Sequence, residues 1–193
     1  MNRPLIRVTD WHTDRAEKEV KWSPAIIVIH WLTAIMVLFL FPLGLWMTEL
    51  GYYDPWFQKS THIHESVGIM LIFLTVLRVF FRRKGVRPVA IKNSTSWTFY
   101  IVSYVHLTLY CLLIGVLLSG YLASTADGNA IIILNWIEIP ATIYGLEKQA
   151  DIAGQIHLIL SICFISVVIL HASAAIKHHY YDKDHTLKRM FKI

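Results

Sequence analysis

The sequence predicts an all-α integral membrane protein, a four-helix bundle whose N- and C-termini both lie in the cytoplasm. Its composition is 55% hydrophobic and only 16% charged, with a mean hydropathy of +0.50, whereas soluble domains carry roughly 25% charged residues. Four apolar stretches each reach the length of about 20 residues that crosses the hydrocarbon core. The basic residues are also distributed unevenly between the loops. Lipid is the cheapest environment for such an excess of apolar side chains.

The four stretches are expected to be helices, because backbone polar groups within lipid must be satisfied inside each segment. The first stretch has residues that favour a helix start, with Ser23 as an N-cap and Pro24 at the first helical position. One transmembrane domain is expected over residues 23–177, between a cytoplasmic N-terminal tail at 1–22 and a cytoplasmic C-terminal tail at 178–193. The helices are predicted at about 24–48, 61–82, 96–122 and 152–177, with an outer loop at 123–151 that is too short to span and is expected to cap the outer surface.

The orientation follows from the basic residues. Of the 18 Lys and Arg residues, all but Lys59 and Lys148 fall in the two tails, the loop at 83–93 and the adjoining helix ends. Cytoplasmic loops of membrane proteins are enriched in Lys and Arg, so this side is predicted to be the inner one. The net charge of +5 then reflects membrane topology, and nucleic-acid binding is excluded as a function.

Five of the ten histidines fall in or at the edge of the predicted helices, where ionisable side chains are costly and usually functional. His157 and His171 are separated by about four helical turns, so they share one helix face and lie about 21 Å apart along the axis. His64 matches the depth of His157, and His30 matches that of His171. We therefore expect two haem b groups, with His64 and His157 as axial ligands of the outer haem iron and His30 and His171 as ligands of the inner haem iron. No Cys-x-x-Cys-His motif is present, so each haem would be held by coordination and packing.

Helical spacing from the predicted ligands indicates further residues of the two sites. Gly44 follows His30 at the same four-turn spacing and Gly68 lies one turn after His64, and both are predicted to let a macrocycle approach the backbone. Arg78 follows His64 at the same spacing and is predicted to pair with a propionate of the inner haem. The alternatives are that the glycines are ordinary helix contacts and that Arg78 extends to lipid headgroups.

Three other groups of histidines have less defined roles. His106 has no partner of matching depth, so a packing or hydrogen-bonding role is favoured over ligation. His62 is an alternative to His64 but is expected at the surface. His178 and His179, at the inner interface, are either part of an aromatic and basic anchor or a quinone headgroup site beside the inner haem.

These residues resemble the bacterial cytochrome b561 family over nearly the full chain. The motifs that carry the resemblance are Ile29-His30-Trp31-Leu32, Ile63-His64-Glu65-Ser66-Val67-Gly68, Leu77-Arg78-Val79, His106-Leu107, His157, Leu170-His171-Ala172, His178-His179-Tyr180, Asp182-Lys183-Asp184 and Thr186-Leu187-Lys188-Arg189-Met190. The resemblance implies two bis-histidine haems b in a four-helix bundle of the bacterial inner membrane. It also implies ubiquinone or menaquinone as the electron-transfer partner.

Some members of that family oxidise superoxide, but seven acidic residues on the outer side disfavour an anionic substrate here. The segment Ser124-Thr125-Ala126-Asp127-Gly128 resembles a subgroup linked to a periplasmic isoprenoid-binding protein. The expected partners are thus membrane lipid, a quinone, and a periplasmic electron donor or isoprenoid-binding protein, with a dimer left open. Two other hypotheses stand beside electron transfer to quinone: a cytochrome b anchor subunit of a larger respiratory enzyme, and a non-redox histidine-lined transporter of haem or metal.

Overall fold

A computed structural model describes residues 22–84, 96–183 and 187–191 of the chain. Its elements are α2 (Pro24–Glu49), α3 (Pro55–Lys84), α4 (Ser96–Ser124), β1 (Ile131–Ile133), β2 (Ile137–Ile139), α5 (Gln149–Tyr180) and the short 3-10 helix η1 (Lys188–Met190). The four α-helices are long and apolar enough to cross a membrane. The predicted four-helix membrane bundle is therefore confirmed, while most of the N-terminal tail and of the loop at 83–93 lies outside the described residues.

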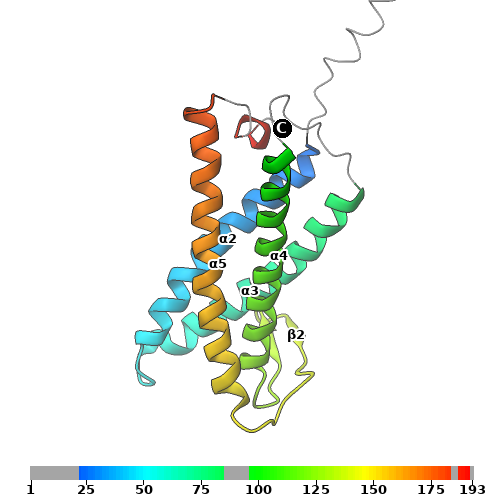
Figure 1. The fold of residues 1–193 in the computed structure, drawn as a ribbon. Helices are drawn as coiled ribbons and strands as arrows, with labels where there is room; N and C mark the ends of the chain where they lie inside the picture. The colour runs from blue at the N-terminus through cyan, green and yellow to red at the C-terminus, as the bar shows by residue number, and fades with distance from the viewer. Residues whose placement is uncertain (1–21, 85–95, 184–186, 192–193) are drawn as a thin grey trace, which may run out of the picture.

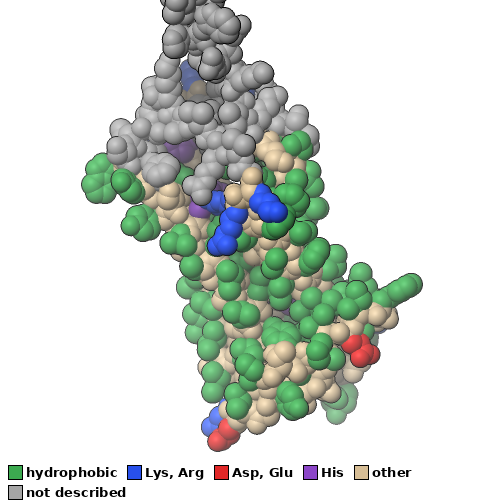
Figure 2. Space-filling view, turned by 90° about the vertical axis from the view of Figure 1, so that its right-hand side faces the viewer, with side chains coloured by type: hydrophobic (Ala, Val, Ile, Leu, Met, Phe, Trp, Pro, Cys, Tyr) green, Lys and Arg blue, Asp and Glu red, His purple; other side chains and the backbone are tan. Residues whose placement is uncertain are grey.

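The helices form two antiparallel pairs, α2 with α3 and α4 with α5, and the pairs cross each other at a clear angle (Figure 1). We call the end that holds the β1–β2 hairpin and the α2–α3 turn the hairpin end. The opposite end, where α3 finishes in Arg82, Arg83 and Lys84, is the basic end. In Figure 2 hydrophobic side chains cover the flank between the two ends, as expected for a surface in contact with lipid.

Two helices are longer than the predicted spans. α3 begins at Pro55 rather than at residue 61, because Asp54 caps it: the Asp54 carboxylate accepts a hydrogen bond of 2.8 Å from the Trp56 N–H, and proline suits the first helical position. α5 covers 149–180 rather than 152–177. With 30 and 32 residues, these helices measure about 45–48 Å and extend beyond the roughly 30 Å hydrocarbon core.

The loop after α4 contains an antiparallel hairpin that the sequence analysis did not predict. Ile131 pairs with Ile139 and Ile133 with Ile137. The hairpin packs against α3 through Ser66, whose hydroxyl donates to the Ile132 carbonyl at 3.3 Å and accepts from the Leu134 N–H at 3.4 Å. Ile131 is buried as a result. The segment is thus anchored against the side of the bundle, one turn beyond His62 along α3.

Candidate functional site

Each of the four long helices carries a pair of polar or small residues, and the spacing within the pair is the same on every helix. The pairs His30 and Gly44, His64 and Arg78, His106 and Gly120, and His157 and His171 all have the same four-turn spacing, one pair on each helix. Midway between the members of each pair lies one residue of the buried core, namely Val37, Leu71, Leu113 and Phe164. The bundle therefore has two layers of polar and small residues, separated by an apolar layer.

The hairpin-end layer surrounds a cavity of about 420 Å³, within the usual range of about 300–1,000 Å³ for cofactor sites. All four helices line it, together with Ile131 of the hairpin. His64 and His157 lie on its wall, as do Gly44 and Gly68, whereas His62 does not. The structure therefore brings together the residues that the sequence assigned to the outer cofactor.

The rings of His64 and His157 come from different helix pairs and lie edge-on to each other, with centroids 6.1 Å apart and planes at 76°. The His157 Nδ1 donates to the Val116 carbonyl at 2.9 Å, so its Nε2 carries the lone pair that a metal requires. The His64 Nδ1 is buried and has no hydrogen-bond partner within the described part of the chain. The His157 ring is thus oriented by a hydrogen bond, and each ring retains a nitrogen that could bind a metal ion.

Two glycines make room for these rings. A Cβ on Gly44 would lie 3.1 Å from Cε1 of His64, and a Cβ on Gly120 would lie 2.8 Å from Cε1 of His157. Gly44 was predicted from the sequence, whereas Gly120 was not, although its four-turn distance from His106 was available as a signal. Gly68 meets nothing within 4 Å, so it borders open space in the cavity.

The basic-end layer holds the other three helix histidines and Arg78. The direct contact of His30 is with Arg78, whose Nη2 is 2.8 Å from the His30 Nδ1. His171 contacts the ring of His106, with centroids 5.3 Å apart. The His106 Nδ1 donates to the Val102 carbonyl at 2.7 Å. The layer thus contains the predicted inner ligands, with His106 closer to His171 than the sequence suggested.

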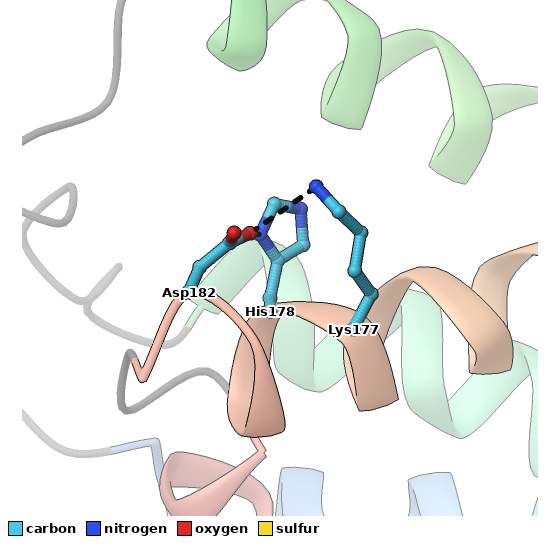
Figure 3. Close-up of polar contacts among 3 residues, drawn as sticks. All are labelled: Lys177, His178 and Asp182. Atoms are coloured by element: carbon cyan, nitrogen blue, oxygen red, sulfur yellow. Dashed lines mark hydrogen bonds and ion pairs between the residues drawn. The ribbon is translucent and has the colours of Figure 1, made fainter.

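The end of α5 and the segment after it add polar contacts at the basic end. The Asp182 carboxylate lies 2.6 Å from the His178 Nδ1 and 3.5 Å from the Lys177 ammonium (Figure 3). His179 stacks edge-on against Tyr180, with centroids 4.9 Å apart. The Trp31 indole, next to His30 in the sequence, donates to the Met190 carbonyl at 2.8 Å and fixes η1 beside α2.

The donor set fits a haem better than a bare metal ion. Within the described ranges, no group of three or more His, Cys, Asp or Glu side chains converges to hold an ion, whereas a haem needs only two ligands from the protein. Metal–imidazole bonds of about 2.0–2.1 Å, as for zinc, put the centroids of two ligands on opposite faces about 6 Å apart. The His64–His157 separation of 6.1 Å agrees with this value.

Comparison with known proteins gives the family. The profile of the family described as prokaryotic cytochrome b561 matches residues 21–192. The chain belongs to this family. Among its cytochrome b561 relatives, cytochrome b561 homolog 2 of Escherichia coli K12 is 43% identical over 161 residues, which cover 83% of this chain and 86% of the relative.

Two further relatives match a larger share of the chain. The probable superoxide oxidase CybB of Yersinia pestis is 30% identical, covering 88% of this chain and 95% of the relative. Cytochrome b561 homolog 1 of Escherichia coli K12 is 27% identical, covering 88% and 96%. As a cytochrome b561 with four apolar helices, the protein is a multi-pass protein of the bacterial inner membrane, and membership of the family implies haem b and electron transport.

Proposed function

We propose that the chain binds two haem b groups, one at each end of the bundle, and transfers electrons between a donor at the hairpin end and a membrane quinone at the basic end. The observation that carries the proposal is that His64 and His157, from different helix pairs, lie on the wall of the hairpin-end cavity with ring centroids 6.1 Å apart. His171 lies on the same helix as His157, at the four-turn spacing. When bound, a haem with two imidazole ligands supplies a six-coordinate iron that changes oxidation state without an open position for oxygen.

His64 and His157 are the proposed axial ligands at the hairpin end. They belong to different helix pairs, α2–α3 and α4–α5, so together they would hold a haem between the two pairs. Val116 orients the His157 ring through its carbonyl, and a hydrogen bond to the other ring nitrogen fixes the tautomer of a ligating histidine. Gly68 borders the space that the macrocycle would fill.

His30 and His171 are the proposed ligands at the basic end. They too belong to different helix pairs, as His64 and His157 do. His106 lies on α4, which packs directly against α5, so it stands beside His171 rather than across from it. His106 in the basic-end layer corresponds to Gly120 in the hairpin-end layer, and we assign it to packing against the His171 ring, 5.3 Å away between centroids.

The proposed quinone site lies at the basic end, near His178 and His179. The His178 ring is held by Asp182, and its side chain is 37% exposed, which leaves it accessible to a ligand. A histidine–carboxylate pair at the membrane surface can donate a hydrogen bond and a proton to a bound quinone. The Lys and Arg residues near this end support a cytoplasmic location for it and for both termini.

The proposed donor at the hairpin end is neutral or cationic. Among the described residues, Glu49, Asp127, Glu138, Glu147 and Asp151 are exposed at this end, against the two exposed lysines Lys59 and Lys148. Local negative charge slows the approach of an anion and favours that of a cation. Superoxide is therefore a poor candidate despite the name of the Yersinia pestis relative, and a periplasmic protein is a better one.

Haem stoichiometry of the purified protein tests the proposal. The wild type should hold about two low-spin b haems per chain, one for each proposed bis-histidine pair. His157→Ala should lose mainly the hairpin-end haem and His171→Ala mainly the basic-end haem, with His62→Ala as a control that keeps both. Protein purified without haem but active in metal flux would overturn the proposal in favour of a transporter. A soluble catalytic subunit that co-purifies would instead indicate an anchor subunit.

A further inference from the structure

Two arginines near the basic end of α3 are partly buried within a membrane-spanning bundle. Arg78 and Arg82 lie one turn apart, and both are half-buried. In the part of the chain that the structure describes, the ion pairs are those that Asp182 makes with Lys177 and His178, so neither guanidinium has a carboxylate partner there. A desolvated cation is costly unless it is paired, and an anionic ligand would supply the missing partner.

Both arginine side chains lie close to the ring of Tyr110 on α4. The guanidinium carbon of Arg78 lies 5.5 Å from the centroid of the Tyr110 ring, and that of Arg82 lies 5.4 Å from it. The Tyr110 hydroxyl is buried and has no hydrogen-bond partner among the described residues, although buried tyrosine hydroxyls usually have one. Two guanidinium groups and one unpaired hydroxyl therefore gather around a single ring, one turn from His106.

Arg78 also forms a hydrogen bond to a ring nitrogen of His30, a proposed haem ligand. Because a guanidinium can only donate hydrogen bonds, the His30 Nδ1 must be the acceptor in their 2.8 Å contact, and the ring proton is then on Nε2. An imidazole that binds iron through Nε2 needs its lone pair there and its proton on Nδ1. His30 cannot ligate in this way until Arg78 moves away.

We propose that Arg78, Arg82 and Tyr110 form a cradle for the propionate carboxylates of the basic-end haem, and that Arg78 leaves His30 to donate to a carboxylate when this haem binds. The inference rests on the basic-end haem of the proposed function, and it adds Arg82, Tyr110 and the movement of Arg78. Guanidinium–carboxylate hydrogen bonds are charge-assisted and often bidentate. Each one lost is expected to weaken haem binding about tenfold. The same oxyanion chemistry is offered by the phosphate of an anionic lipid, and the test must separate the two.

The test uses the purified full-length holoprotein with Arg82→Gln and Tyr110→Phe variants. Loss of a nearby cation destabilises the added electron, so Arg82→Gln should lower the reduction potential of one haem, the one lost in His171→Ala, and speed its dissociation about tenfold. Tyr110→Phe should speed the dissociation of the same haem without a change in charge. Arg82→Lys should restore the potential more than the dissociation rate. The matched controls are the exposed neighbour in Arg83→Gln and the exposed Tyr104 in Tyr104→Phe.

The outcomes separate this inference from the proposed function. If the wild type holds only the hairpin-end haem, the two-haem proposal fails. If it holds both haems and Arg82→Gln changes neither potential nor dissociation rate, the cradle is wrong while the two-haem proposal stands. A loss of tightly bound phospholipid phosphorus from Arg82→Gln, with both haems unaffected, would assign the cradle to a lipid phosphate and overturn the inference.

Discussion

Gly120 lies directly against His157, since a Cβ at this position would be 2.8 Å from Cε1 and 2.9 Å from Nδ1 of the imidazole. Real Cβ atoms do not approach a ring this closely, so the Gly120→Ala variant must turn His157 or separate α4 from α5. Either change also breaks the His157–Val116 hydrogen bond. We expect Gly120→Ala to lose most of its hairpin-end haem and to keep the other, as measured from the reduced-minus-oxidised spectrum and the haem content.

Gly115→Ala is the control for this prediction, because it makes the same change on the same helix. A Cβ at Gly115 would meet only Cδ1 of Leu160, at 3.0 Å, and the end of a leucine side chain can move aside. Equal haem loss in both variants would show that α4 tolerates no added methyl group, and that Gly120 has no particular role at His157.

The pairing at the basic end gives a second prediction. Because His106 stands beside His171 within the α4–α5 pair and His30 lies in the other pair, His30→Ala should lose the basic-end haem. His106→Ala should retain it, with a shifted electron paramagnetic resonance signal, since the His171 ring loses its neighbour at 5.3 Å. Haem loss in His106→Ala together with retention in His30→Ala would make His106 the ligand.

Only some residues of the two layers could be predicted from the sequence. Matching helix depths predicted His64 and His157 at one level, the four-turn spacing from His30 added Gly44, and the one-turn spacing from His64 added Gly68. The structure places all four on the wall of the hairpin-end cavity. Gly120 lies at the four-turn spacing from His106, but it was missed because His106 had no assigned role. The contact between His30 and Arg78 was not predictable, because it depends on how α2 packs against α3 and on which conformer a long side chain adopts.

The sequence likewise predicted the four helices of the fold but not the hairpin. Hydrophobic length was sufficient for four helices, while the start of α3 at Pro55 depended on an Asp54–Pro55 signal that lies outside the most apolar stretch. The β1–β2 hairpin was not predicted, because its turn has Leu134 and Asn135 at φ of 49° and 62°, and leucine rarely adopts this conformation. Its position depends on a long-range contact with Ser66, which periodicity does not reveal.

The Ser66 contact gives a third prediction. Ser66→Ala removes the hydroxyl that bonds both Ile132 and Leu134, and each hydrogen bond lost is expected to cost about 0.5–1.5 kcal/mol. Amide hydrogen exchange across 131–139 should therefore become faster. Ser119→Ala is the control, because the similarly buried Ser119 hydroxyl bonds only carbonyls of its own helix. Unchanged exchange in Ser66→Ala would mean that apolar packing of Ile131 alone holds the hairpin.

A fourth prediction concerns Trp31 and η1. The Trp31 indole donates to the Met190 carbonyl, and its ring packs on Phe191 with centroids 4.8 Å apart. Trp31→Phe keeps an aromatic ring but removes the hydrogen bond, so tryptic cleavage after Lys188 should become faster. Trp97→Phe changes an exposed tryptophan and should leave the cleavage rate unaffected. If both variants are cleaved at the wild-type rate, η1 is held by other contacts.

The last prediction concerns the contact between Asp182 and His178. The Asp182 carboxylate lies 2.6 Å from the His178 Nδ1 and fixes the orientation of the ring in the proposed quinone site. Asp182→Asn should slow quinone reduction by the reduced protein about tenfold, less than the 10²–10⁴-fold typical of losing an acid–base group itself, with haem content and both potentials unchanged. Lys177→Gln is the control, because the exposed Lys177–Asp182 pair at 3.5 Å is of a type that contributes little. Stopped-flow oxidation by a soluble quinone separates the two variants, and an Asp182→Asn rate equal to that of the wild type would exclude the His178–Asp182 pair from the quinone site.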